Sequence, residues 1–424
     1  MIWQFLLVLF SLLLIGMPVA FAMMIAASVM LFLVGIFNTS TLAEYLITGA
    51  NSFSLMAIPF FILTGEIMNA GGVSKRIVDF ASSLVGHFRG GLGYVAIIAG
   101  VVFAGLSGSA VADTAALGAI LIPMMVAQGY NKNSTTGLVA SVGIIGTVIP
   151  PSIPMILYGV VGGVSITQLF MAGIVPGLIM AMGMMLVWYL LSRKTTAGRV
   201  EKATGRERLH YFLRAFWALL LPGIIIIGLR GGVFTPTEAG VIAAVYALLI
   251  SFVYREIKVS QLYDVLVGTA KTTAIVMLIA SAAIVTAYAI TVARVPAELA
   301  TVLGGMTENP TVMLLIIMAF LLLVGCVMDM TPAVLIFAPV LIPVVESLGI
   351  DPVYFGVLMV INLSIGLITP PVGTVLYVGC SISKISLLDI TKGIWPMLAM
   401  YFAVLISFIL FPQIVTVPME WLSK

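Results

Sequence analysis

The chain alternates long apolar stretches with short breaks that are polar or rich in glycine and proline. The stretches are far longer than the alternating strands of a membrane barrel, which run for about ten residues. Since only helices and closed barrels satisfy every backbone polar group in lipid, the pattern predicts an all-α polytopic membrane protein. Composition agrees, with 62% hydrophobic and 8% charged residues, against about 25% charged in an ordinary soluble domain.

A shift of 220 residues superimposes the second half of the chain on the first. The shift pairs Leu121-Ile122-Pro123 with Leu341-Ile342-Pro343, and the Gly146 and Pro150-Pro151 group with Gly366 and Pro370-Pro371. Because the helix-interrupting residues stay in register, we interpret the chain as two repeats, 1–192 and 215–424, joined by a linker at 193–214.

Each repeat is predicted to cross the membrane five times and to carry one re-entrant hairpin. The predicted spans are about 2–16, 18–36, 53–70, 133–164 and 168–192, then 212–229, 236–254, 272–292, 352–383 and 393–415. The hairpins are 92–127 and 310–346, and the broken spans are 133–164 and 352–383. An odd number of crossings inverts the second repeat relative to the first, an architecture of many secondary transporters.

Basic residues set the topology, because cytoplasmic loops hold the excess of lysine and arginine. If the linker is cytoplasmic, 15 of the 19 basic residues lie inside; Arg230, Arg294 and Lys424 fall outside, and Lys271 is undecided. Both termini are then periplasmic. The linker is interpreted as a solvated connector, with a lipid or partner contact as the alternative.

Two amphipathic stretches, 73–88 and 295–306, correspond under the shift and precede the hairpins. They are too polar to cross the membrane and too apolar for loops, so we predict helices lying along its two faces. Two interpretations stay open: rigid arms that hold a moving block, or simple interfacial anchors.

Candidate chemistry lies where helices are interrupted in apolar surroundings. The hairpin tips are 105–114 and 325–332, and the breaks in the spans are 146–154 and 366–374. Paired prolines leave carbonyls without helical partners, and these suit a small hard cation, whereas half-helix N-termini suit an anion. A purely structural kink is the alternative.

Asp113 and Asp329 are the ionisable residues nearest the predicted membrane centre. Charge there is costly, so each is a candidate for cation or substrate contact. The alternative is that each caps its second half-helix. Glu66 and Glu238, at the ends of spans, are interpreted as interfacial.

Other classes fit poorly. Gly105-Leu106-Ser107-Gly108 matches the motif of rhomboid proteases, but the only histidines, His87 and His210, lie in an arm and in the linker, out of reach of a buried serine. No Walker A sequence is present. We predict no enzyme activity and no nucleic-acid partner; a channel or a sensor with a transporter-like fold remains the alternative to a transporter.

The tip GLSGSAVADT, the following GTVIPPS and the inverted repeat together resemble the large membrane subunit, the DctM-like permease, of tripartite ATP-independent periplasmic (TRAP) transporters. The resemblance covers essentially the whole chain. It implies an elevator-type fold in the bacterial inner membrane, in which hairpins and broken spans move against a scaffold.

The resemblance also implies sodium-coupled uptake of a small carboxylate, with a separate small membrane subunit and a periplasmic substrate-binding protein as partners. The overall likeness is to the sialic acid branch, with a C4-dicarboxylate permease as the alternative.

By position, the resemblance places one cation at Ser107, Ser109 and 146–150 and the other at Gly325, Met328, Gly366 and Thr369, largely through carbonyls. Within the first range these are the carbonyls of Gly146, Val148 and Pro150. Substrate is expected near Ser109, Asp113, Ser152, Asp329 and Thr374.

Overall fold

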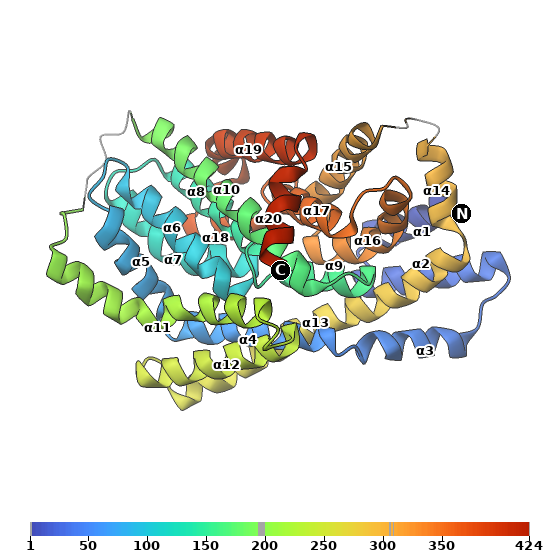
Figure 1. Ribbon diagram of the computed structural model, residues 1–424, viewed down its shortest axis with the longest axis horizontal. Coiled ribbons are helices and arrows are strands. Elements are labelled where there is room, and N and C mark those ends of the chain that lie inside the picture. Colours follow the sequence, from blue (N-terminus) through green and yellow to red (C-terminus); the bar gives the residue numbers. More distant parts are fainter. Residues whose placement is uncertain (1, 194–199, 305–306, 308, 424) are drawn as a thin grey trace.

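The computed structural model describes residues 2–193, 200–304, 307 and 309–423, and every regular element in these ranges is a helix (Figure 1). The predicted all-α fold is confirmed. Eight of the described helices are long and apolar enough to cross a membrane, or nine spans if one bent pair counts as a single span. Three of the eight, α7, α15 and α16, belong to the hairpins.

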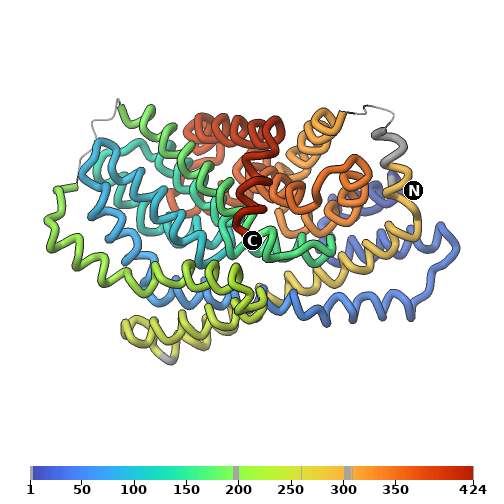
Figure 2. Tube along the Cα trace, in the orientation of Figure 1, coloured from blue at the N-terminus to red at the C-terminus, as the bar shows by residue number. Residues whose placement is uncertain are grey.

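The helices of the first half can be followed from the blue end of the tube in Figure 2. They are α1 (Ile2–Leu14), α2 (Val19–Val34), α3 (Thr39–Ala50), α4 (Ala57–Ala70), α5 (Val73–Val85), α6 (Gly91–Ser107), α7 (Ala110–Ala127), α8 (Lys132–Gly143), α9 (Ile153–Gly162) and α10 (Ile166–Ser192). Two short 3-10 turns, η1 (Ser54–Met56) and η2 (Ile144–Thr147), complete the half.

The second half contains α11 (Gly205–Arg230), α12 (Pro236–Val253), α13 (Val259–Val292), α14 (Val295–Gly304), α15 (Pro310–Val327), α16 (Met330–Ser347), α17 (Pro352–Gly366), α18 (Thr374–Ser383), α19 (Leu387–Leu410) and α20 (Gln413–Ser423). From α2 onward the helices recur near the 220-residue shift: α12 matches α2, and α14 to α19 match α5 to α10. One pair differs in form. The α3–α4 pair is bent by 48°, whereas its counterpart α13 is a single helix of 34 residues.

Several helices begin earlier than the hydropathy predicts, because polar residues cap them. The linker gives way to α11 at Gly205, where Thr204 and Glu207 form a capping box: Thr204 N donates to Glu207 Oε2 at 2.7 Å and Glu207 N donates to Thr204 Oγ1 at 3.3 Å. Such reciprocal bonds satisfy first-turn amides. Residues 194–199 of the predicted linker lie outside the described residues.

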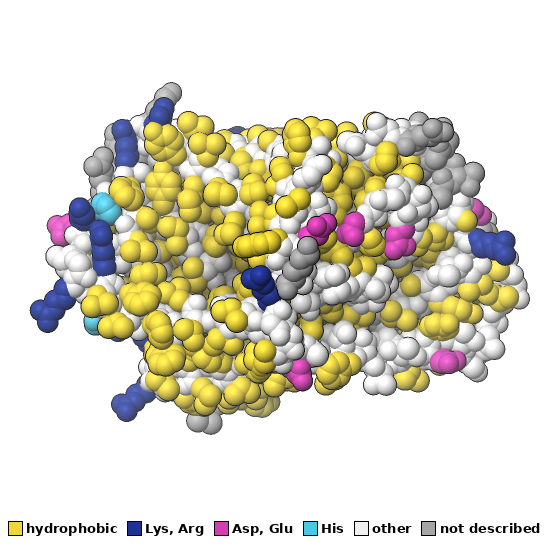
Figure 3. Space-filling model, in the orientation of Figure 1, with side chains coloured by type: hydrophobic (Ala, Val, Ile, Leu, Met, Phe, Trp, Pro, Cys, Tyr) yellow, Lys and Arg dark blue, Asp and Glu magenta, His cyan; other side chains and the backbone are white. Residues whose placement is uncertain are grey.

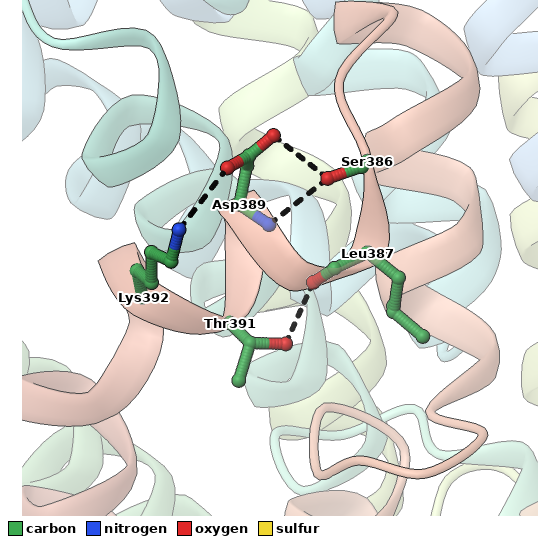
Figure 4. A network of polar contacts seen from close by, with 5 residues as sticks. All are labelled: Ser386, Leu387, Asp389, Thr391 and Lys392. Atoms are coloured by element: carbon green, nitrogen blue, oxygen red, sulfur yellow. Dashed lines mark hydrogen bonds and ion pairs between the residues drawn. The ribbon is translucent and has the colours of Figure 1, made fainter.

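The start of α19, expected at 393, lies at Leu387 for the same reason (Figure 4). Ser386 Oγ accepts a bond from Asp389 N at 3.2 Å and donates to Asp389 Oδ2 at 2.7 Å, and Lys392 Nζ lies 3.6 Å from Asp389 Oδ1. Likewise α13 begins at Val259 rather than 272, and α3 and α20 are helices that hydropathy did not predict.

The helices form an outer layer and an inner block. In the outer layer α4 packs against α12, and α13 runs along α2, α3 and α4. Tyr45 of α3 stacks on Tyr288 of α13 with ring centroids 4.1 Å apart, and Gly49 lies against Ser281, so α3 and α13 are antiparallel.

The inner block interleaves the two repeats. The return helix of the first hairpin, α7, packs against α18, and the return helix of the second, α16, packs against α9, which is the same pairing with the repeats exchanged. Two tyrosines reinforce the exchange: Tyr158 Oη donates to Pro352 O and Tyr401 Oη donates to Ser141 O, each at 2.7 Å. Each hairpin is therefore held by the broken span of the other repeat.

Basic side chains gather at the end of the molecule where α5 meets α11, on a surface that is otherwise broadly apolar (Figure 3). Arg76 of α5 forms a 2.6 Å ion pair with Glu256 and lies over the Tyr254 ring. Burial raises the pKa of the neighbouring Asp79 carboxyl, against the attraction of Lys75 and other nearby basic groups. The first predicted interfacial stretch thus forms α5; the second forms α14, with residues 305–306 outside the description.

Candidate substrate and cation site

One cavity, with a volume of about 340 Å³, separates the two hairpin tips from α4 and α13. Its walls come from the α6–α7 tip, the α15–α16 tip, the first broken span, Leu367 of the second broken span and one face each of α4 and α13. The polar residues lining it are Glu66, Ser107, Ser109, Thr147, Thr272, Asp329 and Thr331. Sites between the halves of interrupted helices are where transporters bind ions and substrates.

The first tip turns at Gly108, whose φ of +65° favours glycine because an L side chain is strained there. Ser109 then caps α7: its Oγ accepts from Ala112 N at 3.4 Å, and its own N–H donates to Ser107 Oγ at 3.2 Å. The first turn of α7, at Ala110 and Val111, consequently faces the cavity.

Asp113 lies behind this tip rather than on the cavity. Its side chain is 1% exposed; Oδ1 accepts a hydrogen bond from Ser107 Oγ, while Oδ2 is buried with no hydrogen-bond partner. A Cβ added at Gly146 would collide with that free oxygen. A buried carboxylate oxygen without a donor is costly, and a cation between Ser107, Asp113 and Gly146 would satisfy it.

The carbonyls of the first break point in different directions. Pro151 O lies 2.5 Å from where a Cβ on Gly108 would stand, and Pro150 O lies 3.7 Å from the equivalent point on Gly105, so both approach the tip. Val148 O instead abuts Gly173 of α10. Val148 therefore directs its carbonyl toward α10 and away from the tip. Both Pro-Pro bonds, 150–151 and 370–371, are cis.

The second tip places its carboxylate on the cavity. Asp329 precedes α16 at the N-cap position, makes no side-chain capping bond and is exposed. Thr374, at the first position of α18, donates to Asp329 Oδ1 at 3.5 Å. Val372 N donates to Cys326 O at 3.2 Å, which ties the second broken span to the tip.

Gly325 and Gly366 bring the second hairpin and the second broken span into backbone contact. A Cβ on Gly366 would lie 2.5 Å from Gly325 C and 2.7 Å from Gly325 O. Near this contact Met328 is extended, and Thr369 Oγ1 donates to Ile365 O at 2.7 Å. The four residues predicted for the second cation thus lie in the two segments that this contact joins, with the Thr369 hydroxyl proton already used.

A hydroxyl pair joins the two broken spans. Thr147 Oγ1 and Ser364 Oγ lie 2.6 Å apart. Thr147 Oγ1 also lies at donating distance from Ile144 O, at 2.7 Å, and Ser364 Oγ at 2.6 Å from Val360 O. Both residues are buried.

Two of the five residues predicted to contact substrate line the cavity, and three do not. Ser109 and Asp329 line it, but Asp113, Ser152 and Thr374 are not among its lining residues. Ser152 is fully buried; its Oγ donates to Thr147 O and accepts from Met155 N at 3.3 Å, so it caps α9. Asp113 and Ser152 are thus buried behind the cavity lining, and Thr374 lies in contact with Asp329.

Sequence reasoning missed three polar residues. Glu66 and Thr272, interpreted as the end and the start of spans, line the cavity from the outer layer. Asn362 is fully buried in α17 and donates to Met318 O of α15 at 2.6 Å. The spacing of Ile62, Gly65 and Glu66, which share one helix face, was the available signal.

The family model described as "Tripartite ATP-independent periplasmic transporter, DctM component" matches residues 6–414. The chain belongs to this family. The TRAP large permease is a transport component and not an enzyme, which removes the protease alternative. Large permeases of this family work with a small permease and a periplasmic substrate-binding protein, and the chain is a multi-pass protein of the inner membrane.

The chain is similar in sequence to other TRAP large permeases over nearly its whole length. A putative TRAP transporter large permease protein of Haemophilus influenzae is 58% identical, covering 95% of this chain and 100% of that one. The 2,3-diketo-L-gulonate TRAP transporter large permease protein YiaN of Escherichia coli is 48% identical over 96% of both chains. The sialic acid TRAP transporter large permease protein SiaM of Vibrio cholerae is 39% identical over 95% of both.

Among solved structures, the YdaH transporter of Alcanivorax borkumensis, described as having an unusual topology, matches with a TM-score of 0.65 and 17% identity. The match covers 88% of each chain. At this identity the likeness concerns the fold alone.

Proposed function

We propose that this large permease takes up a small carboxylate together with sodium ions by an elevator motion. The observation that carries the proposal is the facing pair of hairpin tips across one cavity, each tip interlocked with the other repeat's broken span. That interleaving supports a block moving as a unit against the outer layer of α4 and α13. Freed carbonyls and a buried carboxylate beside the cavity support coupling to a cation.

The first sodium site is proposed at Ser107, Asp113 and Gly146, with Pro150 and Pro151 approaching from the break. Its support is the Asp113 oxygen that lacks a hydrogen-bond partner. The second is proposed at Gly325, Met328, Gly366 and Thr369, through carbonyls and the oxygen lone pairs of Thr369.

The substrate is proposed to be a sugar acid, with sialic acid (N-acetylneuraminate) as the first candidate. The named sialic acid and 2,3-diketo-L-gulonate relatives support this class, since both names denote hydroxylated carboxylates. The substrate carboxylate would meet the first turn of α7, because amides at a helix N-terminus favour anions.

The orientation is proposed from the basic residues: the α5–α11 end faces the cytoplasm, and both chain termini are periplasmic. Figure 1 shows the N-terminus at the opposite end of the view from α5 and the start of α11, which supports opposite sides of the membrane for these two regions; the C-terminus lies near the middle of the view. Labelling of single cysteines introduced near residue 4 and near residue 207 in intact cells and in inside-out vesicles tests the assignment.

Transport is tested in proteoliposomes that contain this chain, its small subunit and its binding protein. Uptake of radiolabelled N-acetylneuraminate, of a second sugar acid and of succinate is measured with and without an inward sodium gradient. Saturable, sodium-dependent uptake of a sugar acid is expected. Preferred uptake of succinate would retain the mechanism and change the substrate, and uptake that does not saturate would point to a channel.

A further inference from the structure

A second cavity, with a volume of about 190 Å³, lies between the first turns of α5, the α11 segment near residue 211 and the loop that follows α12. It shares no lining residue with the cavity between the hairpin tips. Three of its lining residues are basic and two are acidic. The full lining is Gly72, Lys75, Arg76, Asp79, Tyr211, Arg214 and Glu256.

The basic groups of this cavity are only partly paired with its carboxylates. Arg76 forms its 2.6 Å ion pair with Glu256, and Arg76 Nε is buried without a hydrogen-bond partner. Among the described residues, neither Lys75 nor Arg214 has an ion-pair partner within 4.0 Å. Burial raises the pKa of the Asp79 carboxyl and all three basic groups oppose that rise, so they lie within electrostatic range of one point. The cavity thus has an excess of positive charge and space for an anion.

The cavity opens beside an apolar surface of α11. Trp217 lies three positions after Arg214 and is therefore its neighbour on the helix surface. Trp217 and Leu213 are both exposed. Tyr211 and Trp217 are residue types that gather at the level of lipid headgroups, and α5 is the first helix predicted to lie along a membrane face. A ligand with a charged head and apolar chains fits this combination better than a free anion.

We propose that this cavity binds the phosphate group of an anionic phospholipid. Lys75 of α5 and Arg214 of α11 supply the unpaired charges, while Arg76 is held in position by Glu256 and the Tyr254 ring. Basic pockets between helices at the cytoplasmic side of membrane proteins recognise such headgroups. Because α5 packs against both α11 and α6 of the first hairpin, the bound lipid holds the start of the hairpin segment against α11. In the proposed orientation the lipid belongs to the cytoplasmic leaflet.

Native mass spectrometry of the purified complex of this chain with its small subunit tests the proposal, because it counts bound lipids directly. The complex, in neutral detergent, is titrated with phosphatidylglycerol and with phosphatidylethanolamine of the same acyl chains. These two lipids share a phosphodiester and differ in net charge. The parent complex is expected to reach half occupancy with phosphatidylglycerol at a concentration about tenfold or more below that for phosphatidylethanolamine.

The double variant Lys75→Gln/Arg214→Gln should lose this preference, with half occupancy by phosphatidylglycerol shifted about tenfold or more to higher concentration. Both side chains are exposed, so the thermal unfolding midpoint without added lipid should be unchanged. Lys202→Gln/Arg206→Gln is the matched control. It removes one exposed lysine and one exposed arginine outside the cavity lining and should keep the preference of the parent.

Asp79→Asn should act in the opposite direction. It removes a negative charge from the lining and should tighten binding of phosphatidylglycerol severalfold, a change that a purely structural role of Asp79 does not produce.

Equal binding of the two lipids by the parent complex, or a preference that survives in Lys75→Gln/Arg214→Gln, overturns the proposal. Glycerol 1-phosphate, which carries a phosphate without acyl chains, is the competitor that separates a lipid from a soluble ligand. Displacement of phosphatidylglycerol by glycerol 1-phosphate at a comparable concentration would identify a soluble phosphate compound as the ligand and overturn the assignment to a lipid.

Discussion

The two hairpin tips occupy equivalent places in the repeats but differ in where they hold their carboxylate. The first tip buries Asp113 against Gly146, with one oxygen lacking a donor; the second exposes Asp329 on the cavity, beside Thr374. The backbone breaks are symmetric, whereas the chemistry attached to them is not. The two repeats therefore share similar backbone breaks but differ in side chains. Those of the first tip suit a cation, and those of the second tip form part of the cavity wall.

Substitution of the glycines in the two broken spans should distinguish a loss of thermal stability from a loss of sodium coupling. The largest effect is expected for Gly366→Ala. In Gly366→Ala the new Cβ would meet the backbone of Gly325 at 2.5 Å, which cannot be relieved by a side-chain rotation. Overpacking of this kind costs about 1–3 kcal/mol or more. We expect a lowered midpoint of thermal unfolding and loss of uptake.

Gly146→Ala is the matched comparison, since its Cβ would collide with the end of the Asp113 side chain and would lie at an ordinary 3.7 Å from the backbone of Ala104. This variant should keep most of its thermal stability and lose sodium dependence. Equal losses of stability in the two variants would show that both contacts are structural.

Asp113→Asn should raise the sodium concentration for half-maximal uptake by at least tenfold, because the amide removes the charge at the oxygen that lacks a partner. The measurement is a sodium titration at saturating substrate. A titration equal to that of the parent chain would show that Asp113 hydrogen-bonds Ser107 but does not bind sodium.

Asp329→Asn should impair uptake about three- to tenfold through the apparent affinity for substrate, with expression and the sodium titration unchanged. The reason is its position on the cavity, without a capping bond. Uptake kinetics equal to those of the parent chain would show that Asp329 takes no part in substrate binding. A shifted sodium titration would show that the carboxylates of both tips act on sodium.

Thr369→Ala should have the smallest effect, a two- to threefold weakening of sodium dependence. The Thr369 proton is used by Ile365 O, so only lone pairs are available to a cation. The sodium titration measures it, and a change as large as that of Asp113→Asn would show that the hydroxyl leaves Ile365 when sodium binds.

The fold could be predicted from the sequence wherever helices stop at local signals. Gly146, Gly366 and the paired prolines break helices whatever packs around them, which is why both broken spans were predicted within a few residues. Helix starts in polar segments were not predicted, because hydropathy does not detect capping. The capping box of Thr204 and Glu207 starts α11 before its apolar stretch begins.

The candidate site was harder to predict, because a residue's place at a break does not tell which way it faces. Ser109 and Asp113 are four positions apart on the same tip, yet only Ser109 lines the cavity. Glu66 comes from a helix remote in sequence, and its place on the cavity wall follows from how α4 packs against the first tip. That packing is a tertiary property that no local pattern encodes.

The contact between Thr147 and Ser364 limits how the protons of these two hydroxyls can be arranged. Each hydroxyl has one proton, but the pair takes part in three close oxygen contacts, two with carbonyls and one with each other. Two protons serve three bonds, so either Ile144 O or Val360 O goes without its hydroxyl donor. The two arrangements interchange by rotation of the two hydroxyls alone. The contact between the two broken spans thus has two hydrogen-bond arrangements of opposite direction, which exchange without moving the backbone.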